Sequence, residues 1–206
     1  MSYIELLKAA VEMFYAQDAE RLLRRIDGQS ACERCIVNCI ARYLWSLIQQ
    51  RGLAVDVDVE YNLDCKSDDP KRIRLEACRF CNRAECLMHA FVNGRIRWRE
   101  IRKVMRGNPL IYPDLIVHVR DTNKNYLAVE FKKDDEARKH HGDYKNAAKW
   151  DMAKLQYLSC RERMSGVGPY EETVFVILKS NGADFIQPEQ FPTVERIGNT
   201  SADVNG

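Results

Sequence analysis

The chain has 206 residues, of which 46% are hydrophobic and 30% are charged. This composition supports a hydrophobic core and excludes a wholly disordered chain, and the length fits one globular domain with a modest insertion. Lysine and arginine (32) nearly balance aspartate and glutamate (30), so attraction to an anionic partner depends on local patches. No stretch approaches the roughly 20 apolar residues of a membrane span, and the amino terminus is not a signal peptide. We therefore predict a soluble cytoplasmic protein without a membrane partner.

The first 50 residues are predicted to be helical. Residues 3–26 carry apolar side chains at helical spacing and indicate one or two amphipathic helices, and a second helical segment is expected at 31–50. Glu33 falls within the apolar stripe of this second segment. A carboxylate that faces a core is costly unless it has a partner or a cation. The alternative is that Glu33 lies in a hydrated first turn, where the helix dipole favours it.

The remainder of the chain alternates predicted strands with one long helix. Strands are expected at 53–63, 110–119, 125–133 and 172–180, with a short final strand at 183–188. Residues 134–142 are predicted to be a charged loop. The helix at 143–164 has an apolar stripe that contains a second misplaced carboxylate, Asp151, among Tyr144, Ala147, Ala148, Leu155 and Leu158.

This order of elements predicts an α/β fold in which helices flank a mixed β-sheet. We expect a single domain over residues 1–197, with a polar, cysteine-rich insertion at 64–108. The tail at 198–206 is predicted to be disordered.

A possible catalytic group follows from the two strands at 110–119 and 125–133. Glu130 and Lys132 are two residues apart in a strand and therefore share a face. If the two strands form a hairpin, Asp114 and Glu130 can bind one Mg²⁺ or Mn²⁺ ion through their carboxylates. Lys132 could then orient or deprotonate a water molecule, or neutralise a phosphate. The alternative is a solvated strand face with a local Glu–Lys pair.

Five segments that include these residues resemble the PD-(D/E)XK nuclease superfamily, which has the restriction-endonuclease-like fold, and more closely a family of small bacterial and mobile-element members. The segments are CERCIVNCIARYL (32–44), VDVEYNL (57–63), IYPDLIVHV (111–119), YLAVEFKK (126–133) and WDMAKLQYL (150–158). The stretch at 64–108 departs from the pattern because it is longer and richer in cysteine.

The resemblance assigns roles to individual residues. It implies that Asp114 and Glu130 ligate the metal, that Glu33 completes the metal shell directly or through water, and that Lys132 assists the attacking water. Asp151 and Lys154 match a D-x-x-K-L pattern, to which we assign packing or support of the site. Glu60 and Tyr61 match an EYN motif without an assigned role.

Seven of the eight cysteines fall into two groups. Their spacing makes the second group a candidate structural zinc site, with an iron–sulfur cluster as an alternative. Its ligands would be Cys78, Cys81, Cys86 and His89, with Cys65 as an alternative ligand. The contrary interpretation is that these thiols are small apolar fillers. The first group, Cys32, Cys35 and Cys39, lies along one predicted helix and is interpreted as packing.

A basic segment at 95–106 is a candidate nucleic-acid contact, because clustered cations beside an aromatic residue suit a phosphate backbone. Its basic residues are Arg95, Arg97, Arg99, Arg102, Lys103 and Arg106. The alternative is a solvated helix face. His140 and His141 are interpreted as part of a surface loop.

The leading hypothesis from the sequence is a Mg²⁺- or Mn²⁺-dependent nuclease that hydrolyses phosphodiester bonds, with DNA favoured over RNA. The alternative is an inactive nucleic-acid-binding or protein-interaction module on the same fold. A third hypothesis makes the cysteines the functional part of a zinc or iron–sulfur regulatory protein. A homodimer is left open, because cutting both strands of a duplex favours one.

Overall fold

The structure is a computed structural model that describes residues 2–23, 32–60, 112–138, 144–159 and 169–191. The predictions for the insertion at 64–108, for the tail at 198–206 and for Tyr61 fall outside these ranges. No helix in the described part of the chain is long and apolar enough to cross a bilayer.

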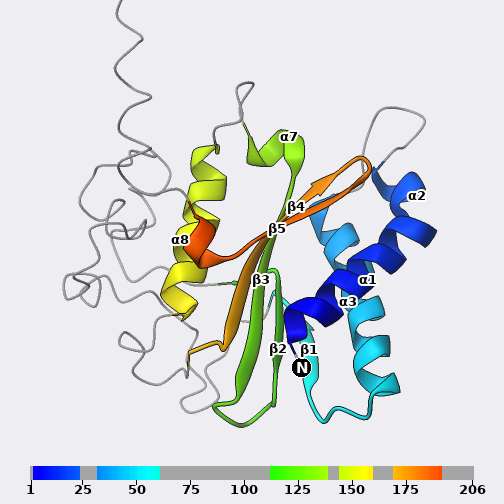
Figure 1. The fold of residues 1–206 in the computed structure, drawn as a ribbon, viewed down its shortest axis with the longest axis vertical. Helices are drawn as coiled ribbons and strands as arrows, with labels where there is room; N and C mark the ends of the chain where they lie inside the picture. The colour runs from blue at the N-terminus through cyan, green and yellow to red at the C-terminus, as the bar shows by residue number, and fades with distance from the viewer. Residues whose placement is uncertain (1, 24–31, 61–111, 139–143, 160–168, 192–206) are drawn as a thin grey trace, which may run out of the picture.

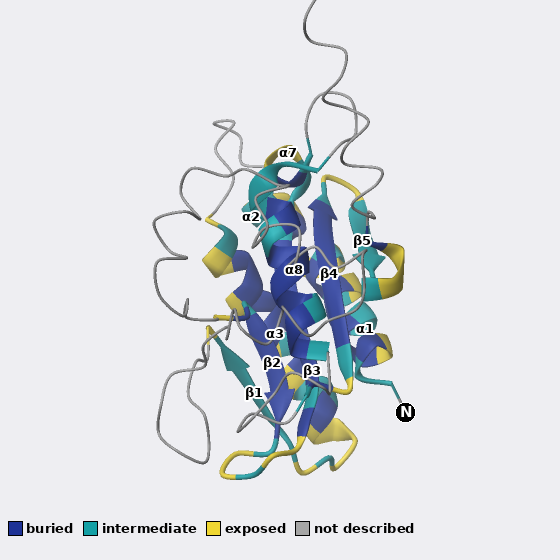
Figure 2. Ribbon diagram, turned by 90° about the vertical axis from the view of Figure 1, so that its left-hand side faces the viewer, coloured by how far each residue is buried: buried dark blue, intermediate teal, exposed yellow. Residues whose placement is uncertain are grey.

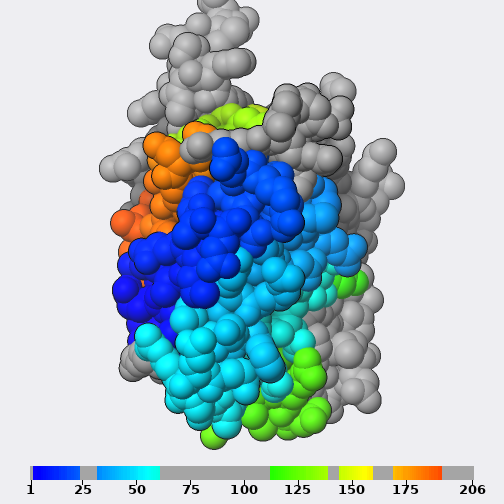
Figure 3. Space-filling model, turned by 90° about the vertical axis from the view of Figure 1, so that its right-hand side faces the viewer, coloured from blue at the N-terminus to red at the C-terminus, as the bar shows by residue number. Residues whose placement is uncertain are grey.

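The described elements form an α/β fold with a five-stranded mixed sheet between helices (Figure 1). The helices on one side are α1 (Tyr3–Gln17), α2 (Ala19–Leu23) and α3 (Glu33–Gln50), and Figure 3 shows their side chains covering this face. On the other side lies α8 (Asn146–Ser159), which contacts β3 and β4. The predicted fold class is therefore confirmed at the level of a mixed sheet flanked by helices.

The sheet has the strand order β1-β2-β3-β4-β5. Its strands are β1 (Asp56–Val59), β2 (Leu115–His118), β3 (Asn125–Lys133), β4 (Glu172–Lys179) and β5 (Gly182–Ile186). All neighbouring pairs are antiparallel except β3 and β4, which are parallel. Parallel neighbours need a crossover connection, and α7 (Asp134–Ala137) and α8 lie in this connection. A 3-10 turn at Pro188–Gln190 follows β5.

Burial follows the position of each strand in the sheet. In Figure 2 the central strands are mainly buried, whereas the edge strands β1 and β5 are of intermediate burial along their whole length. Along β3, Leu127, Val129 and Phe131 join the core under α1 and α3. The alternate positions Glu130 and Lys132 pair with residues of α8. The sequence-based prediction that Glu130 and Lys132 share a face is confirmed by their partners on α8.

Several predicted boundaries need correction. The predicted loop at 134–142 begins with the short helix α7, whose three acidic residues in the first turn suit the positive end of a helix dipole. The strands predicted at 53–63 and 110–119 are shorter, and β1 is followed at once by Glu60, which has a φ of 53°. The helix predicted from 143 begins at Asn146, so Tyr144 lies before it, in an isolated β-bridge with Arg138.

Candidate active site

Six charged side chains meet where the carboxyl-terminal half of β3 lies between the start of α3 and the middle of α8. We call them the charged cluster: Glu33, Asp114, Glu130, Lys132, Asp151 and Lys154. They come from four segments of the chain that are far apart in the sequence. The structure thus brings together Glu33, Asp114, Glu130 and Lys132, the four residues that the sequence suggested as catalytic.

The hairpin of β2 and β3 positions Asp114. Leu115 pairs with Val129 in the antiparallel register, so Asp114 lies level with Glu130, one residue before the start of β2. Asp114 Oδ2 accepts a hydrogen bond of 2.7 Å from the backbone N–H of Phe131. The carboxylate is therefore fixed on the same strand that carries Glu130 and Lys132.

Lys132 connects the helices on the two faces of the sheet. Its Nζ lies 2.9 Å from Glu33 Oε1 of α3 and 3.2 Å from Asp151 Oδ2 of α8. It also donates a hydrogen bond of 3.0 Å to the carbonyl oxygen of Phe131. Glu33 lies in the first turn of α3, as the hydrated alternative proposed, but its carboxylate is paired with Lys132.

Lys154 contributes a second ammonium group. Its Nζ lies 2.7 Å from Glu130 Oε1 and 2.8 Å from Asp151 Oδ1. Glu130 is only 1% exposed, so this pairing compensates part of the cost of burying its charge. Asp151 therefore contacts both lysines. The sequence assigned Asp151 and Lys154 to packing or site support, and the structure places both in direct contact with the predicted catalytic residues.

Burial dominates the electrostatics of the carboxylates in the charged cluster. Desolvation raises the pKa of Glu33 and Asp114 even though Lys132 opposes the shift, and it raises the pKa of Glu130 well above its usual range despite Lys154. Four carboxylates face only two ammonium groups, so the cluster carries excess negative charge when all of its groups are ionised.

The two lysines respond in the opposite direction. Burial alone would lower the pKa of Lys132, but Asp151, Asp114 and Glu33 outweigh it, and the pKa is raised. Lys154 behaves in the same way because Asp151 and Glu130 surround its ammonium group. Both lysines are therefore held in the charged form.

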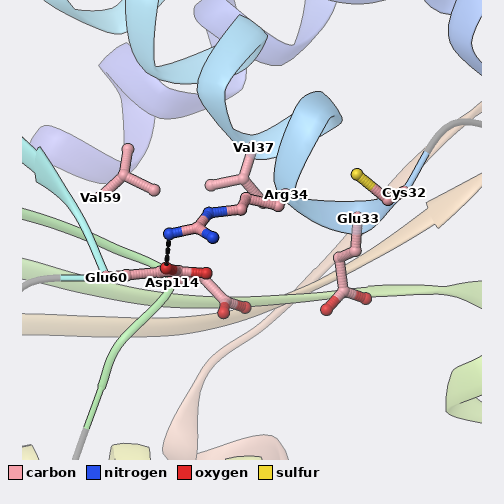
Figure 4. A pocket seen from close by; sticks show the side chains of 7 residues that line it. All are labelled: Cys32, Glu33, Arg34, Val37, Val59, Glu60 and Asp114. Carbon is pink, nitrogen blue, oxygen red and sulfur yellow. Dashed lines mark hydrogen bonds and ion pairs between the residues drawn. The ribbon is translucent and has the colours of Figure 1, made fainter.

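A cavity of about 310 Å³ opens beside the charged cluster (Figure 4). Its lining combines polar and apolar side chains: Cys32, Glu33, Arg34, Val37, Val59, Glu60 and Asp114. Arg34 and Glu60 form an ion pair across it. Glu33 Oε2 is buried and has no hydrogen-bond partner. The sequence reasoning missed Arg34, because an exposed arginine one residue after Glu33 gives no signal before the neighbouring strand is placed.

The donor chemistry of this site fits a hard divalent cation. Carboxylate oxygens are the ligands that Mg²⁺ and Mn²⁺ prefer, and an unpartnered carboxylate oxygen of Glu33 lies beside the cavity that Asp114 also lines. Among the described residues, no three His, Cys, Asp or Glu side chains are already grouped around one coordination centre. Glu33 and Asp114, which both line the cavity, could contribute carboxylate ligands to such an ion.

The structure corrects the interpretation of the first cysteine group. Cys39 is buried, as expected for packing, and its thiol donates to Asp18 Oδ2 at 3.0 Å. Cys32 and Cys35 are exposed, so the packing role predicted for them is wrong. Their sulfur atoms lie 3.0 Å apart.

A second polar group, which the sequence did not reveal, lies towards the other end of β2. His118 Nε2 and Asp58 Oδ2 are 2.7 Å apart, and Arg120 also pairs with Asp58. Burial opposes ionisation of Asp58, but hydrogen bonds from Arg120 and His118 outweigh it and lower the pKa of Asp58. These contacts join β1 to β2 and serve the sheet rather than the charged cluster.

The other predicted site residues fall outside the described ranges. These are the zinc-ligand candidates Cys65, Cys78, Cys81, Cys86 and His89, the basic residues at 95–106, and the pair at 140–141. Comparisons with models of protein families, with curated proteins and with solved structures found no significant match to this chain.

Proposed function

We propose that the protein is a Mg²⁺- or Mn²⁺-dependent nuclease that hydrolyses DNA phosphodiester bonds on a restriction-endonuclease-like fold. The observation that carries this proposal is the convergence of three carboxylates from separate segments: Glu33 pairs with Lys132, while Asp114 and Glu130 raise each other's electrostatic cost beside the lysines. Their excess negative charge in a largely buried place is relieved when a divalent cation binds.

Each member of the charged cluster has a role in this proposal. Asp114 and Glu130 would hold the ion, and Glu33, whose Oε2 has no hydrogen-bond partner, would complete its shell. The bound cation would supply positive charge that stabilises the negative charge developing on the phosphate. Lys132, whose ammonium group Glu33 and Asp151 hold in place, would position or activate the attacking water.

The surrounding residues hold this arrangement in place. Asp151 fixes the ammonium group of Lys132, and Lys154 neutralises part of the charge of Glu130. The cavity beside Glu33 gives a phosphate a route to the cluster. Arg34 lines that cavity, and its guanidinium group can exchange Glu60 for a phosphate oxygen.

Metal-dependent cleavage of supercoiled plasmid tests the proposal. The wild-type protein should convert the plasmid to nicked or linear forms with Mn²⁺ or Mg²⁺, and a chelator should abolish this conversion. Asp114→Asn and Lys132→Met should lower the rate by about 10²-fold or more, because each removes a group that acts on the metal or the water.

Lys133→Met is the matched control for Lys132→Met. Lys133 is the next residue on β3, and its ammonium group forms an ion pair with Glu136. This variant should keep the wild-type rate. Absence of cleavage by the wild-type protein on double-stranded DNA, single-stranded DNA and RNA with several divalent metals would contradict the proposed function.

One observation favours the inactive binding module as a second candidate. The two lysines pair with Glu33, Glu130 and Asp151, so salt bridges between these side chains contribute to holding the charged cluster together. A protein that binds DNA in fluorescence anisotropy but shows no Mn²⁺ binding in calorimetry would support this second function.

A further inference from the structure

The exposed thiols of Cys32 and Cys35 form a C-x-x-C pair at the start of α3. Their sulfur atoms are 3.0 Å apart, and both side chains are exposed. Cys39, one turn further along the helix, is buried and bonded to Asp18. The first two cysteines therefore form a separate, accessible dithiol, whereas the third belongs to the core.

The backbone around this dithiol suits a disulfide. Cys32 is the N-cap of α3 and has extended backbone angles (φ −61°, ψ 148°), so its side chain is not constrained by a helical turn. Cys35 lies in the first turn, where its backbone N–H donates to the carbonyl oxygen of Cys32 at 3.0 Å. The sulfur atoms need to approach by only about 1 Å to reach the length of a disulfide bond, about 2.05 Å.

We propose that Cys32 and Cys35 are a reversible oxidation site whose substrate is a low-molecular-weight disulfide, and that its oxidation switches the charged cluster to a less active form. In the first step, the sulfur of one cysteine, as a thiolate, attacks the small disulfide, forms a mixed disulfide and releases one small thiol. In the second step, the other cysteine attacks the protein sulfur of the mixed disulfide and releases the second small thiol. The two cysteines lose two electrons and two protons in total, and the small disulfide gains both.

The disulfide would act on the charged cluster through Glu33. Glu33 and Arg34 lie between the two cysteines in the sequence, inside the loop that the disulfide closes, and Cys32 lines the same cavity (Figure 4). Closing the loop shifts the first turn of α3 by a fraction of the sulfur movement and displaces Glu33 from Lys132, which is 2.9 Å away in the reduced form. A misplacement of about 1 Å near reacting groups can cost about 10²-fold in rate, so the smaller displacement of Glu33 should cost about 10-fold. This regulatory step rests on the proposed function, whereas formation of the disulfide does not.

Peptide mapping tests the oxidation site directly. The reduced protein is incubated with oxidised glutathione, quenched in acid, alkylated and digested, and the linked peptides are identified by mass spectrometry. A peptide that contains a Cys32–Cys35 disulfide, and that returns to two alkylated cysteines after treatment with dithiothreitol, is the expected result. Full alkylation of both residues after prolonged oxidation would overturn the proposal.

Two variants separate the dithiol from the remaining cysteines. Cys35→Ser should stop at a glutathione adduct on Cys32, because the second thiol is missing. Cys39→Ser should still form the Cys32–Cys35 disulfide, because Cys39 points into the core. If Cys32 forms as much internal disulfide in the Cys35→Ser protein as in the wild type, then it pairs with a different cysteine. That result would contradict the assignment.

Mn²⁺-dependent plasmid cleavage and Mn²⁺ calorimetry test the regulatory step. Oxidised wild-type protein should cleave about 10-fold more slowly than reduced protein and recover with dithiothreitol. The Cys32→Ser/Cys35→Ser double variant, which has neither thiol of the pair, should cleave at the same rate before and after treatment with oxidised glutathione. Equal cleavage by both forms of the wild-type protein would overturn the regulatory step. If neither form cleaves DNA, the proposed function fails, and the calorimetric Mn²⁺ affinity of the two forms then decides whether the disulfide acts on Glu33.

Discussion

Asp18 shows how a single carboxylate is kept ionised at the end of α1. It accepts hydrogen bonds from the Tyr43 hydroxyl at 2.6 Å and from the Cys39 thiol at 3.0 Å. These two contacts lower the pKa of Asp18 despite its burial, and the contact with Asp18 raises the pKa of Tyr43 to about 12. Tyr43 therefore remains a neutral donor throughout the ordinary pH range.

Tyr43→Phe should destabilise the protein in a pH-dependent way. Because the pKa of Asp18 is lower in the folded protein than in the unfolded chain, its ionised form stabilises the fold above about pH 4, and this contribution is lost as the pH falls through the folded pKa. The loss of one hydrogen bond to a carboxylate should cost about 1 kcal/mol at pH 7. The difference between wild type and variant should shrink towards pH 3 in urea unfolding.

Tyr15→Phe is the matched control for this experiment. The Tyr15 hydroxyl donates to the backbone carbonyl oxygens of Lys179 and Gly182, which do not titrate. Its removal should lower the free energy of unfolding by an amount that does not change between pH 3 and pH 7. A Tyr43→Phe effect that is equally flat would show that Asp18 is not the group responsible.

At the scale of elements, α1 depends on a strand that is distant in the sequence. The Glu172 carboxylate, at the first residue of β4, accepts hydrogen bonds from Ser2 Oγ at 2.5 Å and from the backbone N–H groups of Tyr3 at 2.7 Å and Ile4 at 3.2 Å. The first backbone N–H groups of a helix have no partner within the helix, and a negative charge there interacts favourably with the helix dipole. Glu172 thus satisfies the start of α1 from the neighbouring sheet.

Glu172→Gln should lower the stability of the protein by about 1 kcal/mol, because it keeps one acceptor oxygen but removes the charge. Hydrogen exchange of the first turns of α1 should accelerate, while the amides of β3 should change only with the global stability. Glu171→Gln is the control, since Glu171 is exposed and its side chain takes no part in capping α1. Equal effects of the two substitutions would contradict the capping role.

The sequence predicted some elements closely and others only in part, for physical reasons that differ between them. The bounds of β3 and the end of α3 agree with the predictions made from the apolar patterns of the two segments. Strand β1 was predicted too long, because alternation does not show where a partner strand ends. The cap that Glu172 forms could not be predicted, since its partners are about 170 residues away in the chain.

The contacts within the candidate site were also predictable only in part. The positions of Glu33 and Asp151 on apolar helix faces, together with the Glu-x-Lys spacing on β3, correctly indicated that these side chains would meet. Two further contacts depend on how far each helix is shifted along the direction of the strands. These are the pair Lys154–Glu130 and the pair Arg34–Glu60. The angular position of a residue around a helix predicts which face it lies on, but it does not predict which strand residue it reaches. These contacts could therefore be obtained only from the folded chain.

At the scale of the whole molecule, Lys132 joins the helical layers on the two faces of the sheet. Glu33 comes from α3 on one side and Asp151 from α8 on the other, and both contact the same ammonium group. This lysine therefore couples two layers that the sheet otherwise separates. Residues that share a partner in this way are expected to act non-additively on stability.

A double-mutant cycle of Glu33→Gln and Asp151→Asn tests this coupling. After either single substitution, Lys132 keeps one of its two charged partners, Glu33 or Asp151. The double variant removes both partners of this largely buried ammonium group. In urea unfolding with a chelator present, the loss of stability in the double variant should exceed the sum of the single losses by at least about 0.5 kcal/mol. The control cycle combines Glu33→Gln with Glu172→Gln, which share no ion-pair or hydrogen-bond partner among the described contacts, and it should be additive. Additivity in the Glu33–Asp151 cycle as well would mean that Lys132 does not couple the two layers, and that the charged cluster is held together by the strands alone.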